Sequence, residues 1–301
     1  MNPDTRRTDL ARETLERYRE ASGRRGDPDG LRSSEKTEHG LTVYTVEVLD
    51  THGAEIVHRP VGRYVTVETG RRMEQSAEDL RTAAEVIGAE LRAMLPEAGG
   101  TVLIAGLGNR AITPDALGPK AADRVIASRH LVEQLRDTFP ALRPTAVLVP
   151  GVTGNTGMES REILRGAVGQ IRPSALILID ALAARRSERL CSTVQLADSG
   201  IAPGSGVGND RKAIDRESMG IPCIAIGVPT VVDAATLAAD LLTENGAGNA
   251  AAAMERQQGK SFVTVKEIDR LVEKCAEMIG LAVNLAVQPG LDAADLAMFL
   301  A

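Results

Sequence analysis

The sequence predicts an α/β fold in which helices cover both faces of a mostly parallel sheet. Three observations indicate this class. From residue 101 onward, short apolar runs alternate with segments whose apolar residues recur at helical spacing. Apolar residues make up 43% of the chain but aromatics only 2%, with no tryptophan, which is typical of aliphatic strands buried on both faces. A length of 301 residues is enough to bury a full core.

The first hundred residues predict a helix and a β-rich segment ahead of the alternating region. Residues 10–20 favour a helix, which the Gly- and Pro-containing stretch 22–30 ends. Residues 41–69 alternate apolar and polar side chains and predict three short strands in a meander or hairpin. Residues 76–95 place leucine, isoleucine and alanine on one helical face.

The alternating region supplies the predicted sheet and most of its covering helices. Strands are predicted at 101–106, 145–150, 174–180, 192–198 and 222–227, and helices at 119–139, 158–171, 232–243 and 264–287. Thr264 and Glu267 have the spacing of a capping box at the start of the last helix. Residues 244–261 are small and polar, so we expect a mobile surface excursion there, although its alanine run is also compatible with a helix.

The charge and the cysteine content limit which partners the protein can bind and in which cellular compartment it is expected. A net charge of −6 argues against a protein that binds DNA or RNA through phosphate contacts. The three cysteines form no CxxC pair and no disulfide framework, which favours a reducing compartment; they are Cys191, Cys223 and Cys275. The polar N-terminus and the lack of long apolar runs predict no signal peptide and no membrane span, hence a cytoplasmic protein.

Two aspartates are the candidate catalytic residues. Asp115 follows the first apolar run of the alternating region, and Asp180 ends the run "SALILID". Functional sites of open α/β sheets lie at the carboxyl ends of strands, and two carboxylates there can share one proton and act as acid and base. Plainer roles remain open: Asp115 as a helix cap or turn residue, and Asp180 as an ion-pair partner of Arg185 or Arg186.

The glycine-rich loop "GLGNRA" at 106–111 fits the pattern of a dinucleotide fingerprint. That fingerprint should open a helix at once, whereas Pro114 and Pro119 delay the helix here. We therefore expect the glycines to let the backbone turn tightly beneath Asp115. The residues of this supporting loop are Gly106, Gly108 and Asn109. The glycine-rich stretch 203–209 predicts a flexible loop or a tight backbone crossing. No HExxH motif and no Cys/His cluster occurs, so we expect neither a metal nor another cofactor.

Five longer motifs occur in one order along the chain: "GLGNRAITPDALGP", "GVTGNTGMES", "LILIDALAAR", "DSGIAPGSGVGN" and "GIPCIAIGVPTVVDA". In order and spacing they resemble the germination proteases of spore-forming bacteria, and the N-terminal "RTDLARE" fits as well. The resemblance implies an atypical aspartic endopeptidase that degrades the small acid-soluble proteins coating spore DNA. It places the catalytic aspartates on Asp115 and Asp180, and it implies a fold similar to hydrogenase-maturation proteases.

The resemblance also implies a self-processing zymogen that assembles as a homotetramer in the spore core. Residues 1–9 would be the propeptide and 10–301 a single peptidase domain, with the cut between Asp9 and Leu10. The segment "TDLARE" (8–13) resembles the acid-then-aliphatic site that the family cuts in its substrates. We expect the charged arm to be mobile enough to reach a site on its own or a neighbouring subunit. One departure is Arg110, where a bulky neutral residue is expected.

Two other functions remain compatible with these residues. The first is a metal-dependent processing peptidase of the related fold, in which the two acids would be metal ligands. The second is a non-enzymatic or nucleotide-binding α/β protein, in which Asp180 would be a structural ion-pair partner.

Overall fold

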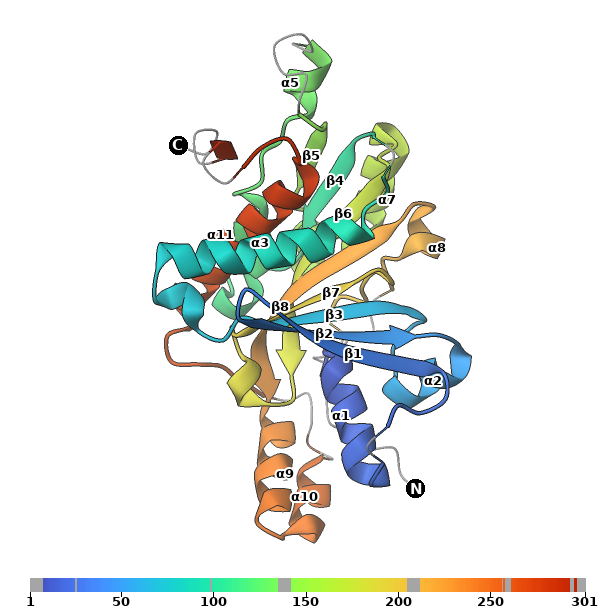
Figure 1. Ribbon diagram of the computed structural model, residues 1–301, viewed down its shortest axis with the longest axis vertical. Coiled ribbons are helices and arrows are strands. Elements are labelled where there is room, and N and C mark those ends of the chain that lie inside the picture. The colour runs from blue at the N-terminus through green and yellow to red at the C-terminus, as the bar shows by residue number, and fades with distance from the viewer. Residues whose placement is uncertain are drawn as a thin grey trace.

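The computed structural model describes residues 8–24, 26–97, 99–134, 142–204, 212–255, 257, 261–292 and 295–296. Within these residues the chain forms an α/β fold around one large mixed sheet (Figure 1). The strands are β1 (Leu31–Glu38), β2 (Leu41–Val48), β3 (Gly62–Glu68), β4 (Val102–Gly106), β5 (Thr145–Leu148), β6 (Ala175–Ala184), β7 (Thr193–Ala197), β8 (Cys223–Asp233) and β9 (Phe262–Val263).

Helices connect and flank these strands. The α-helices are α1 (Ala11–Ser22), α2 (Thr51–Val57), α3 (Ala77–Met94), α4 (Leu117–Ala122), α5 (Arg129–Gln134), α6 (Thr153–Thr156), α7 (Ser160–Ile171), α8 (Arg216–Met219), α9 (Ala234–Glu244), α10 (Gly248–Glu255) and α11 (Ile268–Val287). Three single turns of 3₁₀ helix are η1 (Arg72–Glu74), η2 (Thr113–Asp115) and η3 (Ser187–Arg189).

The strand order is β1-β2-β3-β7-β8-β6-β4-β5, with β9 pairing the end of β8. Strands β5, β4, β6 and β8 are parallel, whereas β7, β3, β2 and β1 continue the sheet in antiparallel pairs. The prediction of a mostly parallel sheet is therefore wrong for half of it. The β-rich N-terminal segment does not stand apart, because β3 pairs with β7 and extends the parallel half.

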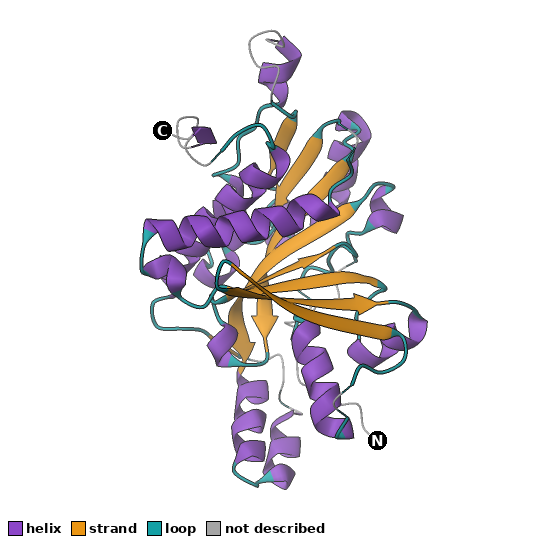
Figure 2. Cartoon of the chain, viewed as in Figure 1, coloured by secondary structure: helices purple, strands orange, loops and turns teal. Residues whose placement is uncertain are grey.

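Helices cover both faces of the sheet, as the sequence predicts. Figure 2 shows α3 and α11 crossing one face, where they and α4 cover an aliphatic core that runs from β2 to β4. On the opposite face α7 and α8 pack against the parallel strands, and α1 and α2 pack against the antiparallel half. Both cores consist mainly of aliphatic residues, as the composition indicates.

The region 41–69 contains two strands rather than the three predicted. Its middle forms α2 instead, because the Asp50 carboxylate accepts a hydrogen bond from the Gly53 N–H at the start of the helix. A strand that the sequence does not predict, β1, pairs with β2 along its whole length. Of its residues only Leu31 is buried, so the alternation that marks a half-buried strand is missing.

In the alternating region every predicted strand forms, but two run further than predicted. β6 continues past Asp180 to Ala184 and β8 continues to Asp233, because the two strands keep pairing with each other there. The predicted helix 119–139 is divided into α4 and α5, and residues 135–139 lie outside the described residues.

The last helix begins later than its predicted capping box. α11 starts at Ile268 with Glu267 as its N-cap, and the Thr264 hydroxyl donates to the Thr230 carbonyl instead of capping the helix. Thr264 therefore binds the end of β8, which the sequence does not indicate.

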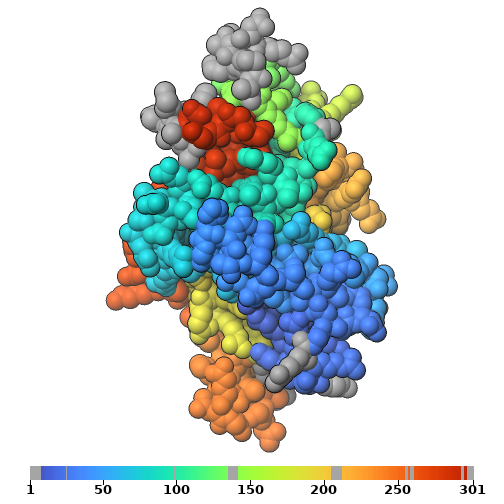
Figure 3. All heavy atoms as spheres, in the orientation of Figure 1, coloured from blue at the N-terminus to red at the C-terminus, as the bar shows by residue number. Residues whose placement is uncertain are grey.

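The excursion at 244–261 contains the helix that its alanine run allows. α10 packs along α9, and in Figure 3 the pair projects in orange from one end of the molecule. Residues 256 and 258–260 lie outside the described part, as do residues 205–209 of the glycine-rich stretch. The mobility of this excursion stays a prediction. Among the described helices, none combines the length and apolar character needed to cross a membrane.

Candidate active site

The loop after β4 crosses directly onto β6. A Cβ at Gly106 would lie 2.4 Å from the Gly118 carbonyl oxygen, and one at Gly118 would lie 2.4 Å from the Ile179 carbonyl oxygen. No side chain fits at either place, so α4 starts in contact with both strands. The Leu107 N–H donates to the Ile179 carbonyl oxygen (2.8 Å) and continues the pairing. The loop that carries Asp115 is thereby held beside β6.

The predicted supporting loop holds Asp115 through its backbone. Gly108 has a φ of +114°, and a Cβ there would lie 2.1 Å from the Asp115 carbonyl oxygen. The Asn109 N–H donates to Asp115 Oδ2 (2.8 Å), and the Asn109 side chain accepts from the Ala111 N–H (3.0 Å). Asp115 does not cap α4, whose N-cap is Ala116. It lies in the 3₁₀ turn η2. Of the two plainer roles considered for Asp115, helix cap and turn residue, its position in the structure is that of a turn residue.

Asp180 lies inside β6 and not beyond its end. It is 5% exposed, and the Ala181 N–H donates to its Oδ1 (2.9 Å). It is in register with Gly227 of β8, over which the Leu182 side chain packs. The prediction that Asp180 follows a strand end is therefore wrong, although the residue still faces a cavity.

The arginines considered as partners of Asp180 bind other acids. Arg185 makes hydrogen bonds to Asp240 (2.8–3.1 Å) and to Glu20 (3.0 Å), and Arg186 binds Glu20 (3.0 Å). Their charges are compensated by these acids.

Asp115 and Asp180 line one cavity of about 360 Å³. Its other walls come from the loop after β4, the end of β6, the start of α7, the end of β8, and segments far away in the sequence. These wall residues are Asp9, Leu107, Gly108, Ile112, Pro114, Val152, Ser160, Ala181, Leu182, Ala183, Pro203, Gly204, Thr230, Val231 and Phe262. The structure therefore places the two predicted acids on the walls of one cavity.

The predicted cleavage site lies at the same cavity. The Asp9 N–H donates to the Ala183 carbonyl oxygen (2.8 Å), and the Ala183 N–H donates to Asp9 Oδ2 (2.9 Å). Leu10 is fully buried among Leu182, Ala184, Leu190 and Val232. These contacts hold residues 8–10 on β6 at the cavity, and the mobility of the arm stays a prediction. Residues 1–7 lie outside the described part of the chain.

Two residues that the sequence does not single out contact this segment. Gln195 of β7 donates from Nε2 to the Asp9 carbonyl oxygen (2.9 Å), and its Oε1 accepts from the Ala11 N–H (2.7 Å). Arg59 donates from Nη2 to the Thr8 carbonyl oxygen, and the same nitrogen lies 4.0 Å from Asp9 Oδ1. No local motif could have identified either residue, because each meets the segment only through the fold.

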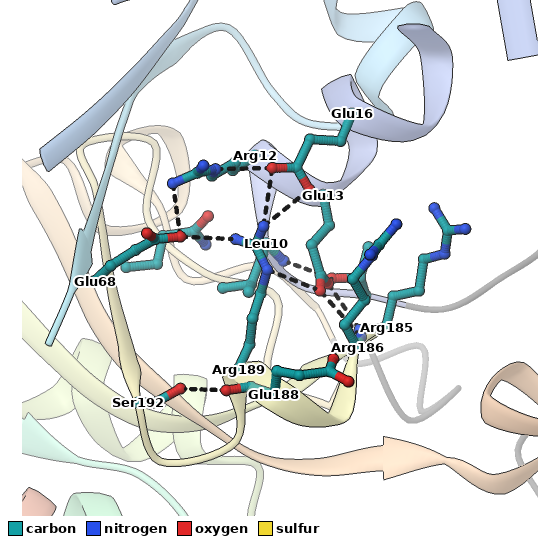
Figure 4. A network of polar contacts seen from close by, with 12 residues as sticks. Leu10, Arg12, Glu13, Glu16, Glu68, Arg185, Arg186, Glu188, Arg189 and Ser192 are labelled. Atoms are coloured by element: carbon teal, nitrogen blue, oxygen red, sulfur yellow. Dashed lines mark hydrogen bonds and ion pairs between the residues drawn. The ribbon is translucent and has the colours of Figure 1, made fainter. Parts of the chain in front are cut away.

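A buried polar network fixes the helix that follows the segment (Figure 4). Glu13, 1% exposed, accepts from the Thr8 hydroxyl and from the Arg185 N–H (2.7 Å). Arg189 reaches Glu13 (3.4 Å) and Glu16 (2.9 Å) from the loop after β6. Burial raises the pKa of Glu13, against these hydrogen bonds, which lower it. The network holds the first turn of α1 and hence the position of Leu10.

Arg110, the residue that departs from the expected pattern, is not among the residues that line the cavity. Its guanidinium makes two hydrogen bonds to the Asp123 carboxylate, at 2.5 and 2.7 Å, and both side chains are half exposed. The described residues contain no group of three or more His, Cys, Asp or Glu side chains that could hold a metal ion.

The fold and the cavity define an α/β protein in which two carboxylates and a bound stretch of peptide meet at one site, an arrangement suited to acid–base hydrolysis. The chain belongs to the germination protease family, whose model matches residues 8–244. It is 37% identical to the germination protease of Clostridium perfringens (strain 13 / Type A), over 98% of each chain. It is 39% identical to that of Caldanaerobacter subterraneus subsp. tengcongensis, over 95% of each. With that of Priestia megaterium it shares 45% identity over 71% of this chain and 59% of the relative. These findings confirm the resemblance and the prediction of a peptidase.

Proposed function

We propose that this peptidase initiates the degradation of small acid-soluble, DNA-coating proteins during spore germination, with Asp115 and Asp180 as its catalytic pair. The observation that carries the proposal is that both acids line the cavity at which Asp9 also lies. Family membership supports a protease that acts in spore germination. The substrate class, a homotetramer and a location in the spore core are parts of the proposal that follow from the resemblance.

The chemistry is hydrolysis of an amide by one water and two carboxyl groups that share a proton. The ionised aspartate accepts a proton from the water as its oxygen adds to the carbonyl carbon. The protonated aspartate donates its proton to the amide nitrogen as the C–N bond breaks, and the products are a carboxylic acid and an amine. The two protonation steps belong to the pair and not to either residue alone.

The chain is also a zymogen that cuts itself between Asp9 and Leu10 and releases residues 1–9. Two observations support this step: Asp9 lines the cavity of the two acids, and Leu10 is buried in an apolar pocket next to it. While residues 8–10 are bound there, no second peptide can occupy the same place. Removal of the propeptide then opens the site to other proteins.

Replacing either aspartate by asparagine tests the pair, because asparagine keeps the shape but exchanges no proton. We expect Asp115→Asn and Asp180→Asn, prepared as chains that start at Leu10 so that no propeptide blocks the cavity, to reduce cleavage of a peptide that copies residues 4–15 by at least about 10²-fold, the usual contribution of a general acid or base. Thermal unfolding should change little.

Asp123→Asn is the matched control, since Asp123 is an acid near the same loop but pairs with Arg110 outside the cavity. It should keep full activity. Full activity of Asp180→Asn would exclude the pair, and loss of its folded state would indicate a structural role for Asp180.

A further inference from the structure

The segment around Asp9 lies between two cavities. The second cavity, of about 340 Å³, lies beside strands β3 and β7 in the antiparallel half of the sheet. It is lined by Arg59, Tyr64, Gln195, Ser199 and Asp215 among others. Asp9 and Leu182 line both cavities, so the acids lie on one side of the segment and Arg59 and Gln195 on the other.

We propose that Arg59 and Gln195 are the substrate-recognition residues of this peptidase. Arg59, together with the Ala183 N–H, selects an acidic side chain immediately before the scissile bond, and Gln195 aligns the backbone of that bond. The inference rests on the proposed function, because it takes Asp9–Leu10 as a bond that the enzyme cleaves.

Two donors face the two oxygens of the Asp9 carboxylate. Oδ2 accepts from the Ala183 N–H (2.9 Å), and Oδ1 lies 4.0 Å from Arg59 Nη2. Both side chains are largely buried, at 17% exposed for Arg59 and 14% for Asp9, so water screens their attraction weakly. An asparagine would turn its NH₂ group toward one of these donors, and the site would reject it.

Arg59 also has hydrogen-bonding capacity left for a substrate. Its Nε is buried and has no hydrogen-bond partner among the described residues. Its other contacts are with carbonyl oxygens of Thr8 and of its own neighbour His58.

The backbone of the segment docks onto a strand that is open to a further chain. β4 pairs with β6 only as far as Ile179, whereas β6 extends to Ala184. Both backbone groups of Ala183 bind Asp9, through the N–H to its side chain and through the carbonyl to its N–H. A substrate can therefore bind β6 by the strand-edge contacts that many peptide-binding proteins use.

Gln195 binds the backbone on both sides of Leu10. The neighbours fix the orientation of its amide, because the Asp9 carbonyl oxygen only accepts and the Ala11 N–H only donates. When water adds to the Asp9 carbonyl carbon, the carbonyl oxygen gains negative charge. Nε2 is already 2.9 Å from that oxygen and stabilises it.

The sheet places Gln195 and Asp180 in one row. Gln195 and Asp180 are each in register with Gly227, which lies between them in β8. Side chains in register point to the same face, and two strand spacings separate the two backbones by about 10 Å. The Leu182 side chain lies over Gly227, since a Cβ there would be 2.6 Å from Leu182 Cγ. Leu182 therefore lies between Gln195 and Asp180 and lines both cavities, and a substrate backbone passes over it.

A double-mutant cycle on the full-length chain tests the acid selection. The rate at which the product starting at Leu10 forms is measured by mass spectrometry at one fixed pH for the wild type, Asp9→Asn, Arg59→Gln and the double variant. Each single change should slow self-cleavage by about 10-fold, because each removes the attraction between the Asp9 carboxylate and the Arg59 guanidinium, which lie 4.0 Å apart and are largely buried. The rate of the double variant should lie within about threefold of the rate of either single variant, because both changes remove the same interaction.

Additive effects of the two changes would overturn the role of Arg59. If the wild type never yields a Leu10 terminus, the self-processing step of the proposed function fails and the recognition of Asp9 fails with it, whereas cleavage of a separate peptide still tests the catalytic pair. Arg59→Lys keeps the positive charge. In the Arg59→Lys background, Asp9→Asn should still slow self-cleavage, but less than it does in the wild type. This comparison gives a second measurement if Arg59→Gln folds poorly. Arg81→Gln, at an exposed position of α3, is the matched control and should leave all rates unchanged.

Gln195→Glu tests the alignment of the bond. It keeps an acceptor for the Ala11 N–H but loses the donor to the Asp9 carbonyl, so self-cleavage should slow by about 10²-fold. A protonated Glu regains an O–H donor, so the rate relative to wild type should recover as the pH falls. A rate within about threefold of wild type, or a ratio independent of pH, would overturn the role of Gln195.

Discussion

Gly108 shows how a single residue fixes the position of a candidate catalytic acid. Its φ of +114° is one that residues with a side chain rarely adopt, and a Cβ there would lie 2.1 Å from the Asp115 carbonyl oxygen. The turn at 108 brings the Asn109 N–H within 2.8 Å of the Asp115 carboxylate. The position of the carboxylate therefore depends on a residue that has no functional group.

We predict that Gly108→Ala destabilises the fold and removes activity together. Left-handed strain and the clash with the Asp115 carbonyl should lower the free energy of unfolding by at least about 2 kcal/mol. Urea unfolding measures this, and peptide cleavage by the folded fraction measures the activity. Gly166→Ala is the control, because Gly166 is exposed in α7 with open space around it and alanine should stabilise that helix by up to about 1 kcal/mol. Equal unfolding curves for Gly108→Ala and the wild type would contradict the strained turn.

The sequence could identify the candidate acids but not their neighbours. Asp115 and Asp180 stand out because each follows an apolar run, and that signal is local. Arg59 and Gln195 contact the segment at Asp9 from positions about 50 and 190 residues away along the chain, so only the assembled sheet brings them together. The sequence around a polar residue in a strand does not indicate which surface its side chain will face in the folded protein.

At the scale of elements, the contact between α4 and α11 positions the candidate site. α4 follows the loop that carries Asp115. Lys120 of α4 and Arg124, which lies just after the helix, both bind Glu273 of α11. Hydrogen bonds from Lys120 and then Arg124 hold the pKa of Glu273 below its ordinary value of 4.5, against partial burial. α11 packs along α3 on the sheet, so this cluster connects the loop to a rigid part of the fold.

We predict a pH-dependent stabilisation from this cluster. A carboxyl group whose pKa is lower in the folded state contributes stability above its unfolded pKa of 4.5, and this is lost as the pH falls through the folded value. Glu273→Gln should therefore lower the melting temperature at pH 7 but make progressively less difference below pH 4.5. The effect should be about 1 kcal/mol or less, since the groups are partly exposed and water screens them. A loss of the same size at every pH would contradict the ionic origin.

The elements also show which parts of the fold the sequence can predict. The strands of the parallel half are apolar on both faces, and their sequence marks them clearly. β1 escapes prediction because its residues are polar and it forms by pairing with β2. The extension of β6 beyond Asp180 depends likewise on its pairing with β8, which a local pattern cannot contain.

At the scale of the whole molecule, the N-terminal segment binds the cavity of its own chain. The contacts of Asp9 with Ala183, of Leu10 with its apolar pocket and of Glu13 with the loop after β6 all lie within one chain. If self-cleavage occurs from this arrangement, it needs no second molecule. The arm is then both the first substrate and the block that keeps other substrates out.

We predict that processing of the full-length chain is intramolecular. The product starting at Leu10 should form with a first-order half-time that does not change when the protein is diluted, because Asp9 of the same chain already lines the cavity of Asp115 and Asp180. Mass spectrometry over a dilution series gives the half-time directly. The control is a mixture of wild type with Asp115→Asn: the variant cannot cut itself, and its own cavity holds its arm, so its Met1 terminus should stay intact while the wild type is processed. A half-time that shortens as concentration rises, or cleavage of the Asp115→Asn chain by the wild type, would show that one chain cuts another and that the docked arm is not the form that reacts.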